Sequence, residues 1–211
     1  MAVLIYVAVG DSLTVGVGAW PGSGLVPQYR ALASKAANAY VESINFGKAG
    51  ATTGDILRLV KSSPRLRFML VRADIITLTA GGNDLIRAAK QFARKPDPHV
   101  FPEALRECRE HYAEIVNTIR TLKASHGNRY IIRAADLYNP YPKVPEAALW
   151  VQRFNRHIDS LQCGNFKMAL VYGQFLGREP EMLSADGLHP NKQGYRTIAE
   201  QMNRLGYRPL L

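Results

Sequence analysis

The sequence predicts an α/β fold in which a mostly parallel, five-stranded sheet is covered by helices on both faces. Short apolar runs rich in β-branched residues alternate along the chain with longer stretches of helical periodicity. The apolar runs lack a polar residue at every second position, which is typical of strands buried on both faces. No repeat or linker divides the 211 residues. We therefore expect one domain over 1–211.

The first strand is predicted over 3–9, where seven apolar residues precede Gly10, Asp11 and Ser12. Glycine and aspartate are turn residues, so the strand ends abruptly and Ser12 lies at its carboxyl edge. Ligands of open parallel sheets bind at that edge, which makes Ser12 a candidate nucleophile. The alternative is that Ser12 only caps the following helix. The glycine-rich segment 14–24 is predicted to be a mobile loop.

The remaining elements alternate between helix and strand. Further strands are predicted over 40–46, 74–80, 129–135 and 166–172. Helices are predicted over 27–39, 55–61, 85–94, 102 to a closing glycine at 127, 146–161 and 193–205. The second of these helices is expected to end at Ser62-Ser63-Pro64. This alternation predicts crossover connections and a parallel sheet.

The formal net charge is +10, which is large for this chain length. The basic residues form two runs: Arg58, Lys61, Arg65, Arg67 and Arg72, and then Arg87, Lys90, Arg94 and Lys95. Such a surface attracts anions, but we favour the alternative that both runs are solvated. Neither run has the repeated aromatic residues between its cations that a single-strand nucleic-acid platform would have, so no nucleic-acid partner is expected.

Apolar runs and cysteines limit other functions. No run approaches the roughly 18 residues of a transmembrane helix. The apolar N-terminus lacks a basic leader, so it is interpreted as a strand and not as a signal peptide, and the compartment stays open. Cys108 and Cys163 have no metal-ligand spacing around them, which predicts two free, mostly buried thiols, with one disulfide as the alternative. No metal site is expected.

His189 is the best placed of the five histidines to act as a base. Asp186 precedes it by three residues in a glycine-containing turn. That spacing allows the carboxylate to fix the imidazole tautomer while the other ring nitrogen faces the hydroxyl of Ser12. Two rival acid–histidine pairs are interpreted as solvated surface. They are Asp97 with His99 and Glu107 with His111.

Gly50 and Asn83 are candidates for stabilising negative charge in the same place. Acyl transfer places charge on the carbonyl oxygen, and a glycine N–H or an asparagine amide is a suitable donor. Each residue also has a purely structural interpretation. Gly50 would be needed only to give the loop a positive φ. Asn83 would be only part of a turn, Gly81-Gly82-Asn83-Asp84, in which Asp84 caps the next helix.

Taken together, these motifs resemble the four sequence blocks of the SGNH (GDSL) hydrolases, in the order of that family. The blocks are Gly10-Asp11-Ser12-Leu13, the loop around Gly50, Gly81-Gly82-Asn83-Asp84 and Asp186-Gly187-Leu188-His189-Pro190. The resemblance implies a flavodoxin-like three-layer α/β/α sandwich. It also implies hydrolysis of esters or thioesters without a metal or cofactor.

The resemblance further implies the residue roles. Ser12 is the nucleophile, His189 the base and then the acid, and Asp186 its partner. The backbone N–H groups of Ser12 and Gly50, with the Asn83 side chain, form the oxyanion hole. We expect a monomer that acts on a small-molecule ester, with an anionic or lipid-like ester such as a lysophospholipid among the candidates.

Two alternatives remain at this point. One is a carbohydrate O-acetyl esterase that uses the same site, and the other is a non-catalytic module that binds polyanions through the basic surface. The substrate preference is expected to depend on the segments 14–24, 87–101 and 174–183.

Overall fold

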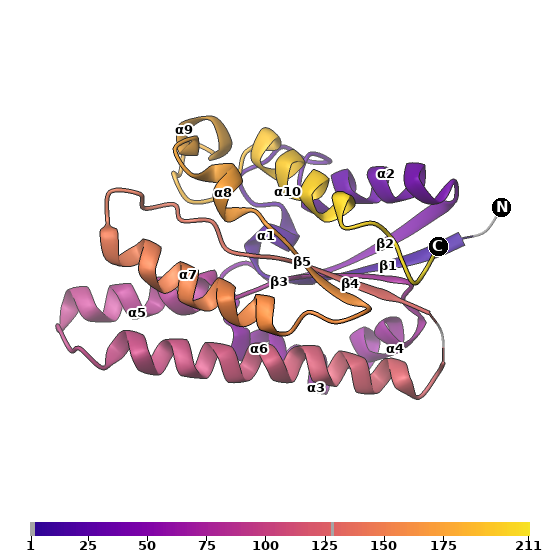
Figure 1. The fold of residues 1–211 in the computed structure, drawn as a ribbon, viewed down its shortest axis with the longest axis horizontal. Helices are drawn as coiled ribbons and strands as arrows, with labels where there is room; N and C mark the ends of the chain where they lie inside the picture. The colour runs from indigo at the N-terminus through magenta and orange to yellow at the C-terminus, as the bar shows by residue number, and fades with distance from the viewer. Residues whose placement is uncertain (1–2, 128) are drawn as a thin grey trace.

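A single twisted sheet lies at the centre of the molecule (Figure 1). The computed structural model describes residues 3–127 and 129–211. The strands are β1 (Val3–Gly10), β2 (Tyr40–Gly47), β3 (Ile75–Thr79), β4 (Ile131–Ala135) and β5 (Phe166–Ala169). They lie in the order β2-β1-β3-β4-β5, and every neighbouring pair is parallel. The predicted α/β fold is confirmed, and the sheet is parallel throughout.

Helices cover both faces of this sheet, as predicted (Figure 1). On one face lie α2 (Leu25–Ala37), α8 (Tyr172–Phe175), α9 (Glu179–Met182) and α10 (Lys192–Arg204). On the other lie α3 (Thr53–Ser62), α4 (Pro64–Arg72), α5 (Gly82–Arg94), α6 (Val100–Ala124) and α7 (Pro145–Ser160). The short α1 (Ser12–Val15) follows β1 directly. No helix within the described ranges is both long and apolar enough to cross a membrane.

Each face of the sheet packs into its own hydrophobic core. Along β1, Val7 and Val9 belong to the core shared with α3, α4, α6 and α7. Tyr6 and Ala8 point the other way, into the core shared with α2 and α10. Alternate side chains of a strand point to opposite faces. A strand with two buried faces must therefore be apolar throughout, which explains the unbroken apolar run at the start of the sequence.

The predicted helix end at Ser62-Ser63-Pro64 is confirmed, because α3 ends at Ser62. A further helix, α4, begins there and was not predicted: Ser63 accepts a hydrogen bond from Leu66 N and caps α4, with Pro64 in its first turn. Proline suits that position because its missing N–H would have no helical partner there. The predicted strand 166–172 ends early, because Tyr172 starts α8. The predicted loop 14–24 begins inside α1.

Two basic side chains are buried in the scaffold. Lys123 donates from Nζ to the carbonyl oxygens of Val71 and Ala73, each at 2.7 Å. Arg133 of β4 donates from Nη2 to the Gly206 carbonyl oxygen at 2.5 Å. Buried charges are tolerated when hydrogen bonds replace the lost water. These two cations therefore hold chain segments together and contribute nothing to the basic surface.

Candidate active site

Ser12 stands where β1 turns into α1, at the carboxyl edge of the sheet. The turn needs a glycine, because a Cβ added at Gly10 would lie 2.3 Å from Thr79 Oγ1. Asp11 caps α1, since its Oδ1 accepts from Leu13 N at 3.0 Å and from Thr79 Oγ1 at 2.8 Å. Burial raises the pKa of Asp11, and these hydrogen bonds oppose the rise. The helix cap is therefore Asp11, and the alternative that Ser12 only caps this helix is wrong.

The Ser12 hydroxyl instead lies within hydrogen-bond distance of His189. Ser12 Oγ lies 2.9 Å from His189 Nε2. On the other side of the ring, His189 Nδ1 lies 2.6 Å from Asp186 Oδ2. With a proton on Nδ1 directed at the carboxylate, Nε2 is left as an acceptor for the serine proton. The structure thus brings together three of the predicted residues, which lie as far as 177 positions apart.

The turn that carries Asp186 and His189 is held by its own hydrogen bonds. Asp186 Oδ1 accepts from the backbone N–H groups of Leu188 and His189, both at 2.9 Å, and from Ser184 Oγ at 2.8 Å. Tyr138 Oη donates to the Leu188 carbonyl oxygen at 2.6 Å. The carboxylate and the imidazole therefore keep a fixed orientation towards Ser12.

These bonds also set the charge of Asp186. Partial desolvation acts to raise its pKa, but the hydrogen bonds from His189, Leu188 and Ser184 outweigh desolvation and hold the pKa well below its usual range. A carboxylate that accepts several hydrogen bonds is stabilised in its ionised form. Asp186 is therefore ionised at neutral pH.

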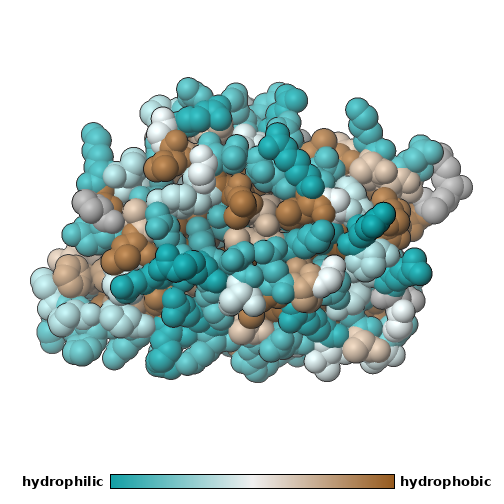
Figure 2. All heavy atoms as spheres, viewed as in Figure 1, coloured by the Kyte–Doolittle hydropathy of each residue, from teal (hydrophilic) through white to brown (hydrophobic). Residues whose placement is uncertain are grey.

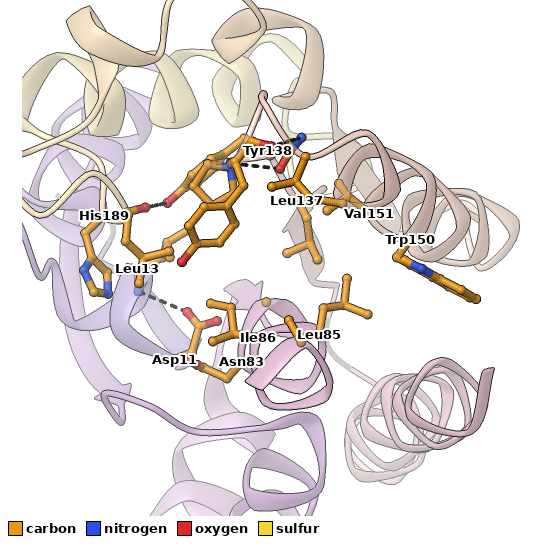
Figure 3. Close-up of a pocket in the computed structure, with 18 of the residues that line it drawn as sticks. Asp11, Leu13, Asn83, Leu85, Ile86, Leu137, Tyr138, Trp150, Val151 and His189 are labelled. Carbon is orange, nitrogen blue, oxygen red and sulfur yellow. Dashed lines mark hydrogen bonds between the residues drawn. The ribbon is translucent and has the colours of Figure 1, made fainter. Parts of the chain in front are cut away.

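Asn83 lies in the first turn of α5. It lines the same cavity as Ser12, and Figure 3 shows Asn83 among the lining residues. One N–H of the Asn83 amide donates to the Ala51 carbonyl oxygen at 2.9 Å. An asparagine amide has two N–H bonds, so this contact orients the side chain and leaves the second N–H available.

Gly50 makes no contact with Ser12, Asn83, Asp186 or His189 among the described hydrogen bonds. It has a φ of +74°, as the turn interpretation expected. Gly50 is not among the described residues that line the cavity. It is connected to Asn83 only through its neighbour Ala51, whose carbonyl oxygen accepts a hydrogen bond from the Asn83 amide. Its carbonyl oxygen accepts from Arg87 Nη2 at 3.2 Å. The structure therefore brings the Gly50 loop against α5 but gives no contact between Gly50 and Ser12.

Asp84 connects the start of α5 to the start of α3, which follows the loop that contains Gly50. The sequence did not predict this role for Asp84. Its two carboxylate oxygens accept from Thr53 N at 2.9 Å and Thr53 Oγ1 at 2.7 Å. Burial raises the pKa of Asp84, and the bonds from Thr53 oppose that rise. The suggested cap of the next helix is wrong, because Asp84 binds the start of α3 instead. This bond fixes the loop that contains Gly50 relative to Asn83.

A cavity of about 320 Å³ extends from Ser12 between α5 and α7. Figure 3 shows His189 and Leu13 at one side of it and Val151 and Trp150 at the other. Most of its lining is apolar. The apolar residues are Leu13, Leu85, Ile86, Ala89, Phe101, Leu137, Pro140, Val144, Ala147, Trp150, Val151 and Leu188. At the far end the rings of Phe101 and Trp150 stack with centroids 5.2 Å apart.

The sequence interpretation located this cavity only in part. Of the three segments expected to shape the site, 87–101 contributes Ala89 and Phe101, but 14–24 and 174–183 contribute nothing to the lining. The second wall comes from α7 and the segment before it. Nothing in the local pattern of α7 distinguished a wall of the site from an ordinary amphipathic helix.

The two rival acid–histidine pairs and the two cysteines do not line the cavity that contains Ser12. His99 is exposed, as expected, and its backbone N–H donates to Asp97 at 2.9 Å. His111 is half-buried beside Thr53, so its interpretation as solvated surface was wrong. Both cysteines are free, but Cys163 is exposed. Among residues 3–127 and 129–211, no three histidine, cysteine or acidic side chains are grouped to hold a metal ion.

Comparison with known proteins gives consistent matches. The model of the GDSL-like lipase/acylhydrolase family matches residues 8–197. The spore germination lipase LipC of Bacillus licheniformis is 38% identical over 206 residues, covering 97% of each chain. The crystal structure of the lipase Lip_vut3 from a goat rumen metagenome is 38% identical, with a TM-score of 0.93 and coverage of 99% of this chain and 100% of that one.

More distant structures share the fold. The acetylxylan esterase Axe2 of Geobacillus stearothermophilus is 17% identical with a TM-score of 0.68, covering 95% of this chain and 93% of that one.

Proposed function

Because this chain belongs to the GDSL-like lipase/acylhydrolase family, we propose that it hydrolyses carboxylic esters through a covalent acyl-enzyme on Ser12. The observation that carries the proposal is the series of contacts from Ser12 Oγ to His189 Nε2, at 2.9 Å, and from His189 Nδ1 to Asp186 Oδ2, at 2.6 Å. A hydroxyl becomes an effective nucleophile when an oriented base takes its proton.

In the first half of the proposed reaction, Ser12 Oγ attacks the ester carbonyl carbon while His189 Nε2 accepts the hydroxyl proton. The carbonyl π electrons move onto the oxygen of a tetrahedral intermediate. When the intermediate collapses, the bond to the alcohol oxygen breaks, and His189 gives its proton to that oxygen. A water molecule then repeats the sequence on the acyl-enzyme, which releases the carboxylic acid and restores Ser12.

The oxyanion of each intermediate needs donors that are already in position. We assign this role to the backbone N–H groups of Ser12 and Gly50 and to the free N–H of the Asn83 amide. Preorganised donors of this kind typically each stabilise the transition state by about 3 kcal/mol. The bond from Asn83 to Ala51 O and the bonds from Thr53 to Asp84 support the assignment of Asn83 and Gly50, because they hold the loop that contains Gly50 against the start of α5.

The cavity favours an acyl ester with an apolar chain over a sugar acetate. An acetyl group is too small to use a cavity that extends from Ser12 to Trp150, and most of the lining is apolar, whereas a sugar needs many polar partners. The relatives named as lipases support the same assignment. The acetylxylan esterase shares the fold at 17% identity, which gives no support for a shared substrate.

A fluorophosphonate probe tests the catalytic proposal. We expect one covalent label per molecule, because only an activated serine attacks phosphorus, and peptide mass spectrometry should locate the label on Ser12. Heat-denatured protein is the control and should not react. Absence of labelling, or a label on another serine, would contradict the proposal and would favour the polyanion-binding alternative.

A chain-length series tests the cavity. Each buried methylene is worth about 0.8 kcal/mol, so kcat/KM should rise roughly fourfold per added methylene until the cavity is full. Ala147 lines the cavity, whereas its neighbour Ala148 does not. We expect Ala147→Phe to lower kcat/KM for an octanoate ester by at least about tenfold, with little change for an acetate ester.

The matched control is Ala148→Phe, at the next position of α7 and also half-buried. It should leave the chain-length profile unchanged. Equal effects of the two substitutions, or equal losses for acetate and octanoate esters, would show that the acyl chain does not enter this cavity.

A further inference from the structure

The mouth of the cavity is surrounded by large apolar side chains that face solvent. Tyr141 and Val144 line the cavity and are 45% and 46% exposed. Leu149 follows the cavity residue Glu146 by three positions on α7, so it lies on the same side of that helix, and it is 44% exposed. Phe92 is 39% exposed and packs on Phe101 with ring centroids 5.8 Å apart. Exposed apolar side chains clustered around one opening indicate an interaction surface, whereas scattered ones do not.

Basic side chains stand among these apolar residues. The segment 85–95 contains Arg87, Lys90, Arg94 and Lys95 and no acidic residue. Lys90 and Arg94 follow Ile86, a cavity residue, at intervals of four along α5, so they extend the cavity wall outwards. In the segment before α7, Lys143 lies between Tyr141 and Val144, and it is exposed.

These cations are available to an external partner. In the described part of the chain, Lys90, Arg94, Lys95 and Lys143 form no salt bridge. Two acidic residues are among the described residues that line the cavity: Asp11 at the Ser12 end and Glu146 near the mouth. Figure 2 shows hydrophobic atoms exposed among strongly hydrophilic ones at the left of the molecule, over the start of α7 as located in Figure 1. The apolar and basic residues therefore form one mixed surface around the opening.

We propose that this rim, defined by Phe92, Tyr141, Val144 and Leu149 with Lys90, Arg94, Lys95 and Lys143, docks onto an anionic lipid surface. The inference rests on the proposed function, because docking would place the cavity mouth against acyl chains. A lipid surface fits both kinds of side chain: lysine and arginine pair with anionic head groups, while tyrosine and the aliphatic residues enter the interface. A nucleic acid would satisfy the cations but would leave Val144 and Leu149 exposed.

Sedimentation with lipid vesicles tests the proposal. We expect the full-length protein to bind vesicles that contain phosphatidylglycerol and to bind pure phosphatidylcholine vesicles far less, with the difference shrinking as salt rises. Each cation near an anionic surface contributes roughly fivefold to binding. The variant Lys90→Glu/Arg94→Glu should therefore lose at least about 25-fold in partition coefficient.

The matched control is Arg30→Glu/Lys35→Glu, which makes the same change in net charge. Both residues lie on α2, which covers the opposite face of the sheet. It should keep vesicle binding within about threefold of the native chain, because its charges lie far from the docked face. Phe92→Ser/Leu149→Ser should weaken vesicle binding without altering hydrolysis of a short water-soluble ester. Neither pair of residues lines the cavity.

Three results would overturn the docking surface. One is equal loss of vesicle binding in the two charge variants, and another is no preference for anionic vesicles. The third is binding to a single-stranded oligonucleotide that is as tight as vesicle binding and insensitive to Phe92→Ser/Leu149→Ser. The short-ester assay tests the proposed function separately. If the native chain does not hydrolyse the short ester, the proposed function is refuted, whereas the vesicle measurements test whether the rim binds lipid.

Discussion

Replacing Ser12 with alanine is expected to lower kcat for a short water-soluble ester by about 10⁴- to 10⁶-fold. The proposed acyl-enzyme cannot form without the hydroxyl, and the remaining donors only stabilise slow attack by water. KM should change little, because the acyl cavity keeps its lining. The rate is measured on purified protein, with fluorophosphonate labelling to show that no contaminating hydrolase contributes.

The fold should survive this substitution. Ser12 Oγ makes one described hydrogen bond, to His189, and α1 keeps its cap at Asp11. The loss of one such bond typically changes stability by about 1 kcal/mol, so thermal melting should shift by a few degrees at most. Ser23→Ala, in the loop after α1, is the control and should keep full activity. If Ser12→Ala hydrolyses esters at the native rate, the proposed mechanism is excluded.

The parallel sheet was predictable from the sequence because burial on both faces leaves a strong local signal. The run from Val3 to Val9 cannot be mistaken for a solvent-exposed strand, and Gly10 marks its end. The same logic located Ser12, Asn83 and the turn of Asp186 and His189, since parallel strands deliver their carboxyl ends to one edge. Their distances could not be predicted, because they depend on how the segments pack.

Features that depend on long-range contacts were missed. Asp84 looked like a helix cap because its sequence neighbours form a turn, yet its partner is Thr53, 31 positions away. The cavity wall supplied by α7 was missed for a related reason. The residues Ala147, Trp150 and Val151 have the spacing of an ordinary buried helix face. A periodic pattern shows that a face is covered but not whether protein or substrate covers it.

The position of the basic residues also depends on the fold. The sequence gives one net charge, +10 for the whole chain, whereas its two basic runs lie on separate helices. Arg65 and Arg72 belong to α4, and Lys90 and Arg94 belong to α5, at the opposite end of the sheet layer (Figure 1). Only the run on α5 adjoins the cavity, so the position of the charge carries information that the total does not.

His189→Ala is expected to lower kcat by a similar factor to Ser12→Ala, about 10⁴-fold or more. Without the imidazole, no group takes the proton of Ser12 or returns one to the leaving alcohol. The acid side of the kcat/KM profile of the native chain should show no ionisation from Asp186, because hydrogen bonds hold the pKa of this carboxylate well below its usual range. A carboxylate-type ionisation that disappears in Asp186→Asn would contradict this assignment.

The double variant Ser12→Ala/His189→Ala distinguishes a catalytic unit from two independent contributors. If Ser12 and His189 act in one proton transfer, removing either abolishes the same step, and the double variant should be no slower than the worse single variant by more than a few-fold. Independent contributions would multiply instead, to about 10⁸-fold, below any measurable rate above the uncatalysed background. The comparison needs kcat for all four proteins on one ester. Additive losses in free energy would mean that the 2.9 Å contact between Ser12 and His189 is not used in the rate-limiting step.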